Sequence, residues 1–290
     1  MRRTDLGTLY VVATPIGNLQ DMSLRAVEVL KHVDCIAAED TRHSQRLLMH
    51  FGIQQRLVSL HEFNENKRVE EMMRRLTAGE NVALISDAGT PLISDPGFPV
   101  VAAAHAARIP VIPIPGPCAA IAALSASGLP THHFVFEGFL PPKGEKRLKR
   151  LQTLALETRT LIFYEAVHRI ENLLQLLVEK FGSDRMACVA RELTKKYETV
   201  RQAPLGELLH IIQQPEQQKG EYVIIVAGAS EKSPTSETEC HHLLEILLSE
   251  VSLKQAVKLA QKITGESRQK LYDGALKITQ KAKIKPSGDR

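Results

Sequence analysis

The sequence Ile85-Ser-Asp-Ala-Gly-Thr-Pro-Leu-Ile-Ser-Asp-Pro-Gly-Phe-Pro99 contains the pattern Ile-Ser-Asp-x-Gly-x-Pro twice, eight residues apart. The apolar run Val82–Ile85 leads into this loop and is typical of a buried strand, and the Ala-rich segment 100–107 after it is compatible with a helix. In α/β folds, ligands bind in such loops, outside the carboxyl ends of the strands. An ordinary strand-to-helix connection has the same composition, so the loop alone leaves both interpretations open.

The first 129 residues alternate strand and helix patterns. Apolar runs predict strands over 9–13, 33–38, 57–60, 82–85 and 110–115, each followed by a helix-compatible segment. This alternation is typical of a mostly parallel sheet with helices on both faces. Parallel strands end at one edge of the sheet, so we expect five loops to converge there: 14–18, 39–42, 61–65, 87–97 and 115–117. None has the dinucleotide fingerprint G-x-G-x-x-G or the phosphate-binding pattern G-x-x-x-x-G-K-[ST].

The rest of the chain predicts a second α/β unit and a helical end. Strand patterns occur at 134–140, 160–164, 186–190 and 221–227, and helical patterns lie between them. The last segment predicts three helices, with a tight turn at 264–266 that suits a helix-turn-helix-like pair. We therefore expect an N-terminal α/β domain over 1–129, a second α/β domain over 130–228, a linker over 229–239 and a basic helical extension over 240–290.

Composition excludes several classes of protein. The hydrophobic fraction of 43% and the charged fraction of 24% are ordinary for a globular protein. The four cysteines are scattered without a C-x-x-C pair, so the sequence predicts neither a zinc site nor a disulfide framework. No apolar run approaches the length of a membrane span, and the first is too short for a signal peptide. These features predict a reduced, cytoplasmic protein with no membrane contact and no metal.

Positive charge is concentrated at the end of the chain. Residues 250–290 contain ten Lys and Arg against four Asp and Glu, a net charge of +6. The whole chain carries +4, so the first 249 residues carry −2. A mildly acidic body with a basic end suits an anionic partner, nucleic acid above all, although a solvated Lys-rich terminus has the same charge.

Several segments together resemble one family, the bacterial small-subunit ribosomal RNA 2′-O-methyltransferase I family within the tetrapyrrole-methylase superfamily. They include the opening loop and Leu9-Tyr-Val-Val-Ala-Thr-Pro-Ile-Gly-Asn-Leu19, Ala38-Glu-Asp-Thr-Arg42, Pro115-Gly-Pro117, Phe163-Tyr-Glu-Ala-Val-His-Arg169 and Ala190-Arg-Glu-Leu-Thr-Lys195. The resemblance covers nearly the whole chain. It implies two α/β domains, with a mostly parallel N-terminal sheet and a mixed C-terminal sheet, and a small C-terminal helical extension. It also implies a homodimer that binds S-adenosylmethionine (SAM) between the two domains and methylates a cytidine 2′-hydroxyl in the decoding region.

The resemblance also implies site residues. SAM would be bound by the strand-end loops at Pro15, Asp87, Ala88, Gly89, Thr90, Leu92, Ile93, Ala119, Ala120, Tyr164, Leu193 and Ala227. The residues do not identify the group that would accept the proton of the 2′-hydroxyl. Glu165 and Lys195 are the candidates we keep, and Glu192, Asp40 and Asp95 are further possibilities. For each candidate a salt bridge is an alternative role, and proximity alone can suffice for the transfer.

Positions for RNA contact follow from basic residues on loops near the expected cleft. They are Arg42, Arg169, Arg191 and Lys196, with a solvated surface as the alternative interpretation. Two other functions remain open. The same fold and cofactor could methylate a small tetrapyrrole or corrinoid precursor, or the chain could be a non-catalytic RNA-binding protein that keeps the fold. The basic helical end favours an RNA substrate over a small one.

Overall fold

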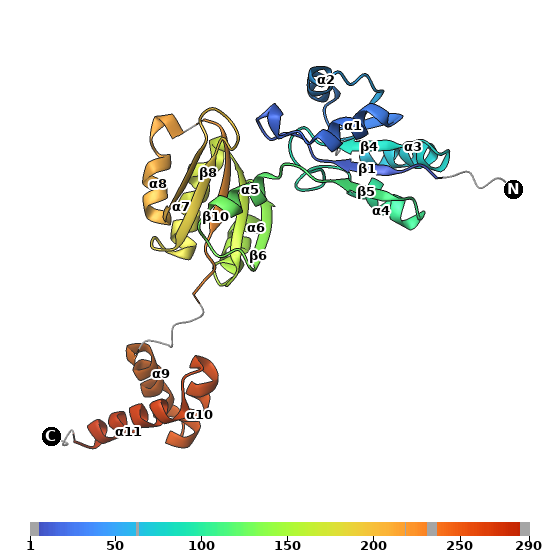
Figure 1. Cartoon of the computed structure of the whole chain (residues 1–290). Helices are drawn as coiled ribbons and strands as arrows, with labels where there is room; N and C mark the ends of the chain where they lie inside the picture. The colour runs from blue at the N-terminus through green and yellow to red at the C-terminus, as the bar shows by residue number, and fades with distance from the viewer. Residues whose placement is uncertain (1–5, 62–63, 218, 231–236, 285–290) are drawn as a thin grey trace. The chain divides into compact units, whose positions relative to one another are not determined.

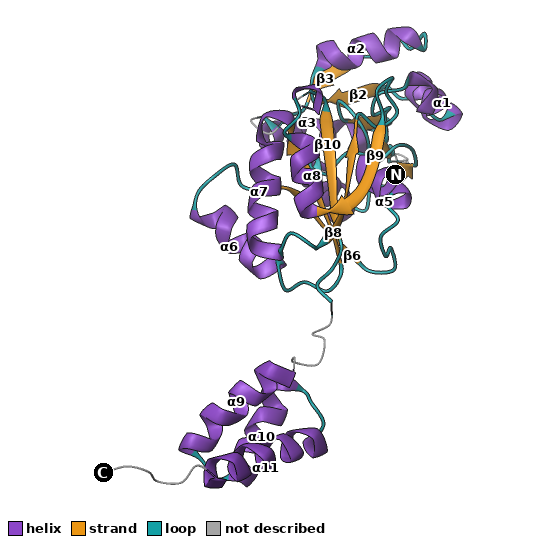
Figure 2. Cartoon of the chain, turned by 90° about the vertical axis from the view of Figure 1, so that its left-hand side faces the viewer, coloured by secondary structure: helices purple, strands orange, loops and turns teal. Residues whose placement is uncertain are grey.

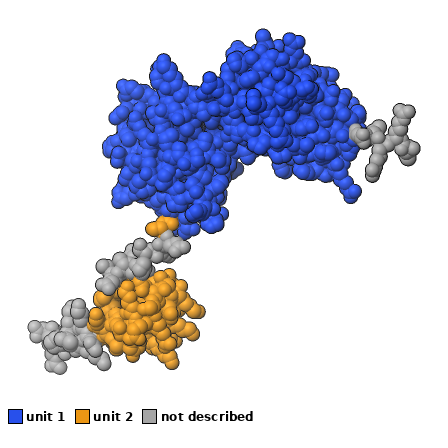
Figure 3. All heavy atoms as spheres, viewed as in Figure 1, with its two compact units in different colours: residues 1–228 blue, residues 229–290 orange. Residues whose placement is uncertain are grey.

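The structure is a computed structural model that describes residues 6–61, 64–217, 219–230 and 237–284. It separates the chain into two compact units, residues 1–228 and residues 229–290 (Figure 3). The larger unit contains two five-stranded sheets, and the smaller unit is helical in its described part. None of the helices among the described residues is long and apolar enough to cross a membrane.

The first sheet is entirely parallel, in the strand order β3-β2-β4-β1-β5. Its strands are β1 (Leu9–Val12), β2 (Cys35–Ala38), β3 (Leu57–Ser59), β4 (Val82–Ile85) and β5 (Val111–Ile114). The expected alternation of strand and helix is confirmed, because the connections are the helices α1 (Leu24–His32), α2 (Thr41–His50), α3 (Glu65–Thr77) and α4 (Phe98–Ala106). A short 3-10 helix, η1 (Leu19–Asp21), precedes α1.

Helices cover both faces of this sheet (Figure 1). The helices α3 and α4 pack one face through side chains such as Met72 and Val100, whereas α1 and α2 pack the other through Leu30 and Leu48. The strands β2 and β4 are fully buried, so their sequences are continuous apolar runs rather than alternating ones.

The second sheet is mixed, in the order β6-β7-β10-β8-β9, with β6 parallel to β7 and the other pairs antiparallel. Its strands are β6 (Phe134–Phe139), β7 (Thr160–Ala166), β8 (Met186–Arg191), β9 (Thr199–Pro204) and β10 (Glu221–Val226). The accompanying helices are α5 (Ala119–Ala126), α6 (Glu145–Leu154), α7 (Ile170–Phe181) and α8 (Leu205–Ile212), with the 3-10 helices η2 (Val167–Arg169) and η3 (Pro215–Gln217).

Helix α5 follows the last strand of the first sheet but packs on the second. Its residues Ala120, Ala123 and Leu124 share a buried cluster with Ile162 and Ile225 of the second sheet. The opposite face of that sheet is covered by α6, α7 and α8. This placement ties the two sheets together on one side of the larger unit (Figure 1).

The sequence analysis missed strand β9. Its sequence Thr-Val-Arg-Gln-Ala-Pro has few apolar residues, and Arg201 and Gln202 are exposed. The strand lies at the edge of the sheet, where one side and much of one face meet solvent, so it needs no apolar run. The extended conformation of β9 is decided by its pairing with β8, which runs from Met186 opposite Pro204 to Arg191 opposite Thr199.

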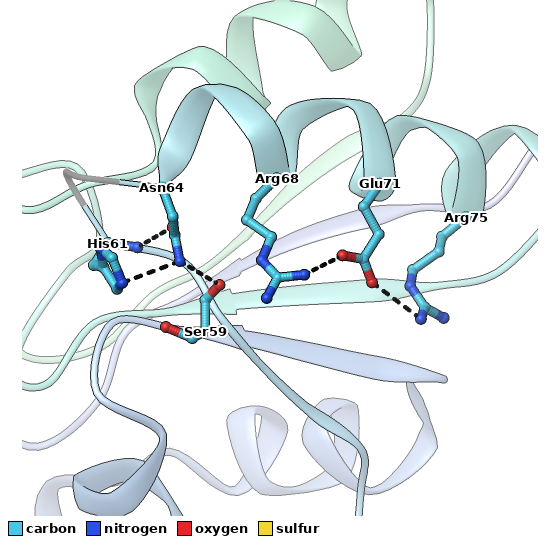
Figure 4. Close-up of polar contacts among 6 residues, drawn as sticks. All are labelled: Ser59, His61, Asn64, Arg68, Glu71 and Arg75. Carbon is cyan, nitrogen blue, oxygen red and sulfur yellow. Dashed lines mark hydrogen bonds and ion pairs between the residues drawn. The ribbon is translucent and has the colours of Figure 1, made fainter.

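Helix α3 is fastened by polar contacts at its start and along one side, where Glu71 and Arg75 are partly buried (Figure 4). The backbone N–H of His61 donates to Oδ1 of Asn64 (2.9 Å), and the Asn64 amide donates to the carbonyl of Ser59 (3.2 Å). Along the helix, Glu71 lies between Arg68 and Arg75 and pairs with both. These contacts explain a helix whose sequence is mostly polar.

In its described part the smaller unit has three helices, α9 (Glu237–Glu250), α10 (Leu253–Thr264) and α11 (Arg268–Ile284), drawn in purple in Figure 2. Their core contains Leu244, Val257 and Leu271. Ser252 and Gln255 form a capping box at the start of α10. The predicted tight turn between the last two helices is confirmed, with Gly265 in the left-handed conformation at φ +72°.

Candidate cofactor-binding site

A cavity of about 470 Å³ lies between the two sheets of the larger unit. Its walls come from both sheets and are mostly apolar, with a few polar side chains. The lining residues are Ile16, Ala88, Gly89, Thr90, Ile93, Ser94, Asp95, Cys118, Ala119, Phe139, Tyr164, Glu165, Ala166, Val167, Ala190, Leu193, Gly220, Glu221, Tyr222 and Val223.

The strand order of the first sheet decides which loops reach the cavity. The loops after β1, β4 and β5 contribute Ile16, the segment 88–95 and the segment 118–119. These three strands are neighbours, whereas β2 and β3 lie at the far edge of the sheet. The five strand ends share one edge of this parallel sheet, as expected, and Asp40 and Glu65 join the loops after β2 and β3 to the loop after β4. The loops 39–42 and 61–65 nevertheless do not line the cavity.

The loop after β4 is fixed by hydrogen bonds to its neighbours. Thr14 and Gly89 exchange backbone hydrogen bonds of 2.9 and 3.1 Å, and the Thr90 hydroxyl donates to the carbonyl of Pro117 (3.0 Å). The backbone N–H of Asp40 donates to Oδ1 of Asp87 (3.0 Å). These bonds connect the loop to the ends of three other strands, so its shape is set before any ligand binds.

The second half of the repeated pattern has a different role from the first. Gly97, with φ +127°, is the N-cap residue of α4, and a Cβ there would lie 2.6 Å from Cδ2 of Leu84. Leu92 and Ser94 adopt positive φ of 73° and 70° although neither is glycine. Such backbone is costly and is concentrated at functional sites. Here it directs Asp95 to the cavity wall.

The second sheet closes the cavity with the carboxyl ends of β7 and β8 and the start of β10. Because β10 is antiparallel to both neighbours, its first residues lie beside their last ones: Tyr222 pairs with Glu165 and with Arg191. The loop after β8 also approaches the loop after β1. A Cβ on Gly17 would lie only 2.6 Å from Cγ of Lys195, so this contact requires a glycine.

The loops at the edge of the first sheet hold a group of acidic side chains. Burial raises the pKa of Asp95 to about 6; a hydrogen bond with Ser86 opposes the rise, and the charge of Asp87 adds to it. Burial also raises the pKa of Glu39, with further contributions from Asp87 and Asp95. A bound cation would relieve this repulsion. Across the residues described, no group of three or more His, Cys, Asp or Glu side chains could hold a metal ion.

Tyr164 connects the second sheet to the start of α5. The backbone N–H of Ala120 donates to the Tyr164 hydroxyl oxygen (3.0 Å), and Phe136 and Phe139 contact the ring edge to face. Burial and the neighbouring Cys118 raise the pKa of Tyr164, so its hydroxyl stays neutral. The Ala120 N–H, at the start of α5, is therefore already paired within the chain.

Seven of the twelve residues predicted to bind SAM line the cavity: Ala88, Gly89, Thr90, Ile93, Ala119, Tyr164 and Leu193. The other five lie behind the wall. Pro15 is buried next to Ile16, Leu92 packs into the core of the first sheet, and Ala227 packs against the core of the second. Asp87 and Ala120 are held in the hydrogen bonds described above. The roles of all twelve in binding stay predictions.

The two catalytic candidates lie in ion pairs. The buried carboxylate of Glu165 pairs with Arg147 (3.2 Å) and Arg169 (2.8 Å). The Lys195 ammonium lies 3.0 Å from Glu192 and 3.1 Å from Glu221. Burial alone would lower the pKa of Lys195, but these two carboxylates raise it above its ordinary value. A protonated amine cannot accept a proton, so the surroundings of Lys195 do not suit a base.

The four predicted RNA contacts divide into two kinds. Arg42 and Lys196 are exposed. Arg191 donates to the carbonyls of Lys219 and Glu216 and to the side chain of Gln217, so it fastens a loop. Arg169 donates to the carbonyl of Leu140 (2.9 Å) as well as pairing with Glu165. The exposed pair can reach an outside partner, and the ammonium of Lys196 also lies over the ring of Tyr197 (5.4 Å).

Sequence reasoning missed several lining residues, notably Ile16, Ser94, Cys118, Phe139, Tyr222 and Val223. Ile16 and Ser94 lie in the predicted strand-end loops 14–18 and 87–97, so listing whole loops would have included them, and Cys118 directly follows the loop 115–117. Tyr222 and Val223 lie inside a strand, and nothing in the sequence distinguishes them from core residues. Their place at the cavity follows from the antiparallel position of β10.

Two family models match the chain. Residues 8–209 match the Tetrapyrrole (Corrin/Porphyrin) Methylases, and residues 234–279 match the RsmI C-terminal HTH domain. Among curated proteins, a Pseudomonas aeruginosa protein named ribosomal RNA small subunit methyltransferase I is 53% identical over 93% of this chain and 97% of its own. Proteins with that name from Xylella fastidiosa (54%; 92% of this chain, 98% of its own) and Escherichia coli O157:H7 (49%; 93% and 95%) are also similar.

Solved structures share the fold at low sequence identity. Uroporphyrin-III-C-methyltransferase from Thermus thermophilus has a TM-score of 0.54 and 22% identity, over 76% of this chain and 94% of that one. Cobalt precorrin-4 methyltransferase has a TM-score of 0.57 and 15% identity, over 76% and 94%. Diphthine synthase has a TM-score of 0.57 and 15% identity, over 76% and 89%. At these identities the likeness concerns the fold alone.

Proposed function

The chain belongs to the ribosomal RNA small subunit methyltransferase I family, within the tetrapyrrole methylases, and on this basis we propose that it methylates small-subunit ribosomal RNA with SAM as the methyl donor. The finer proposal is that the methyl group goes to the ribose 2′-hydroxyl of a cytidine in the decoding region. The observation that carries the proposal is the cavity, whose walls are built by the loops that hold the family motifs.

The residues of the cavity fit SAM. The cavity volume of about 470 Å³ is in the range of small-molecule sites, and a mostly apolar wall with few polar groups is typical of such sites. The apolar side chains Ile16, Ile93 and Leu193 would contact the adenine, and the carboxylate of Asp95 would face the positively charged part of the cofactor. The raised pKa of Asp95 supports this role, because an acidic group crowded by burial and by Asp87 gains from a bound cation.

The protein's part in the proposed reaction is alignment. Bound SAM supplies a methyl group that is already activated, so a correctly placed hydroxyl needs little further chemistry. The ion pairs of Glu165 and Lys195 would hold the cavity wall in shape rather than remove the proton. We assign no general base to the described residues of the cavity.

The test is methyl transfer from labelled SAM to small-subunit RNA and to small-subunit particles, both from a strain that lacks the modification. We expect label in RNA or in particles, and resistance to alkaline cleavage at one cytidine, because a methylated 2′-hydroxyl cannot attack the neighbouring phosphate. Label on a base would contradict the ribose assignment.

Two parallel reactions separate the alternatives. A tetrapyrrole precursor replaces RNA in one, and transfer to it alone would favour the small-molecule function. Binding of RNA without transfer to any substrate would favour a non-catalytic protein. We also propose a homodimer in the cytoplasm, as the family resemblance implies. Light scattering tests the dimer, and an active monomer would contradict it.

A further inference from the structure

Helix α10 carries a row of three lysines on its exposed side. Lys254, Lys258 and Lys262 occur at intervals of four residues, so they follow one face of the helix over ~12 Å. All three are exposed. The opposite face of the helix enters the core of the smaller unit through Ala256, Val257 and Ala260. We call the three residues the lysine row.

The lysine row has no compensating acid. The sequence of α10 contains neither Asp nor Glu, and among the residues described no ion pair joins the row to a carboxylate. Several other lysines of the chain are compensated, for example Lys270 by Glu266 (3.2 Å) and Lys149 by Glu145 (2.7 Å). Three positive charges on one face without a partner form a strong local field for an anion.

We infer that the lysine row binds the phosphate backbone of RNA. Charge complementarity is the argument, because a nucleic acid strand presents several phosphates over the length of the row, and lysine is a compact charge that suits phosphate. The identity of the RNA as the small-subunit ribosomal RNA rests on the proposed function; the surface itself rests on the row.

The geometry points to phosphate contacts rather than to base reading. In a helix-turn-helix pair the first helix crosses the backbone, and the start of the second reads base edges. Here α10 is the first helix and α11 the second. Two side chains in the first turn of α11 are engaged within the unit: Gln269 bonds to Asp273 (3.3 Å) and Lys270 to Glu266 (3.2 Å), while Arg268 is exposed. A helical RNA also has a major groove too narrow for side chains to read.

The test replaces the row in the full chain by Lys254→Gln/Lys258→Gln/Lys262→Gln, since glutamine keeps the helix and removes the charge. The probe is a labelled fragment of small-subunit ribosomal RNA, titrated at several salt concentrations, with a scrambled fragment beside it. Each phosphate contact on a single strand contributes ~0.7 to the salt slope, so the slope should become shallower by about 2. Both fragments should lose affinity equally.

Two matched variants distinguish the effect of losing the lysine row from the effect of losing total positive charge. Lys31→Gln/Lys149→Gln/Lys180→Gln removes the same total charge from lysines that are paired with glutamates. It should leave the salt slope near that of the unmodified chain. Arginine at the three positions of the row should restore binding. SAM affinity, measured by calorimetry, and the melting temperature should stay unchanged in every variant, which excludes misfolding.

Two results would overturn the inference: an unchanged salt slope in the row variant, or an equal loss of RNA affinity in the control variant. Failure of the proposed function is distinguishable from these. If the unmodified chain transfers no methyl group to RNA but the row variant still loses RNA affinity, the surface stands and the reaction does not. If the row variant methylates RNA and binds it with normal affinity, the proposed reaction stands and the inferred surface does not.

Discussion

Replacement of Asp95 by asparagine should stabilise the protein while it weakens SAM binding. In the folded chain the pKa of Asp95 rises from its ordinary value of 3.8 to about 6, mainly through burial. The unfolded chain therefore releases this proton at a lower pH than the folded chain does. Between about pH 4 and 6 the free energy of unfolding therefore falls as pH rises. At neutral pH the full cost of ionising the Asp95 carboxyl in the folded chain is present.

The magnitude follows from the size of the rise. A pKa raised from 3.8 to about 6 corresponds to at most ~3 kcal/mol. Asp95 is only partly buried, so solvent reduces this, and we expect a gain of ~1–2 kcal/mol in the free energy of unfolding at neutral pH. For a unit of this size the melting temperature should rise by roughly 2–8 °C. Asparagine keeps an oxygen near Ser86, so that contact need not be lost.

The assay is thermal unfolding of both proteins without ligand, across pH, together with calorimetric titration of SAM. The gain in melting temperature should vanish below about pH 4, where the carboxyl is neutral in both states. SAM affinity of the unmodified chain should fall by roughly tenfold at about pH 5, because only the ionised form would bind the cation. In the variant that pH dependence should be weaker.

The reasoning is refuted if the variant melts at the same or a lower temperature at neutral pH. An SAM affinity equal to that of the unmodified chain would refute the role of Asp95 in binding. Asp87→Asn in the same loop is the matched control. It removes a neighbouring charge that does not line the cavity, so it should lower the pKa of Asp95 while affecting SAM binding less.

Further substitutions test the surroundings of the cavity. Asp87→Ala should lower the free energy of unfolding by ~1 kcal/mol, since it removes the acceptor of the Asp40 backbone N–H. It should also weaken SAM binding by loosening the loop after β4, and an unchanged SAM affinity in calorimetry would contradict this. Gly17→Ala should weaken SAM binding because its Cβ would lie 2.6 Å from Cγ of Lys195 and 2.8 Å from Oγ1 of Thr194, so the loops after β1 and β8 would have to separate; an unchanged SAM affinity would contradict this. Glu165→Gln should lower the free energy of unfolding by ~3–5 kcal/mol in urea titrations, as it leaves the buried Arg147 unpaired; a change below ~1 kcal/mol would refute this.

Much of the fold was legible from local patterns. Continuous apolar runs such as Val82–Ile85 predict buried strands, and helices between them predict a parallel sheet, because only such connections join parallel neighbours. Ser23, the predicted N-cap of the first helix, does accept a hydrogen bond from the Ala26 N–H. The edge strand β9 was not legible, since its pairing with β8 rather than its own residues makes it a strand.

The sequence by itself determined the family and the loops from which a site can be built. Its motifs lie at strand ends, and seven of the predicted SAM-binding residues do line the cavity. Only the tertiary structure decided which loops meet there. The order β3-β2-β4-β1-β5 places the loops after β1, β4 and β5 at the cavity and those after β2 and β3 beyond the loop of β4, and that order depends on contacts between distant segments.

The same division holds for single side chains. Asp87 and Asp95 occupy equivalent positions in the repeated pattern, and the family resemblance assigned Asp87, not Asp95, to the cofactor. In the folded chain Asp87 accepts a hydrogen bond from the Asp40 backbone, whereas the positive φ of Ser94 directs Asp95 to the cavity. From the sequence alone Glu165 is a candidate proton acceptor, and only the folded chain places its carboxylate between Arg147 and Arg169. Local sequence supplies the chemical groups, and long-range packing decides which of them are free to act.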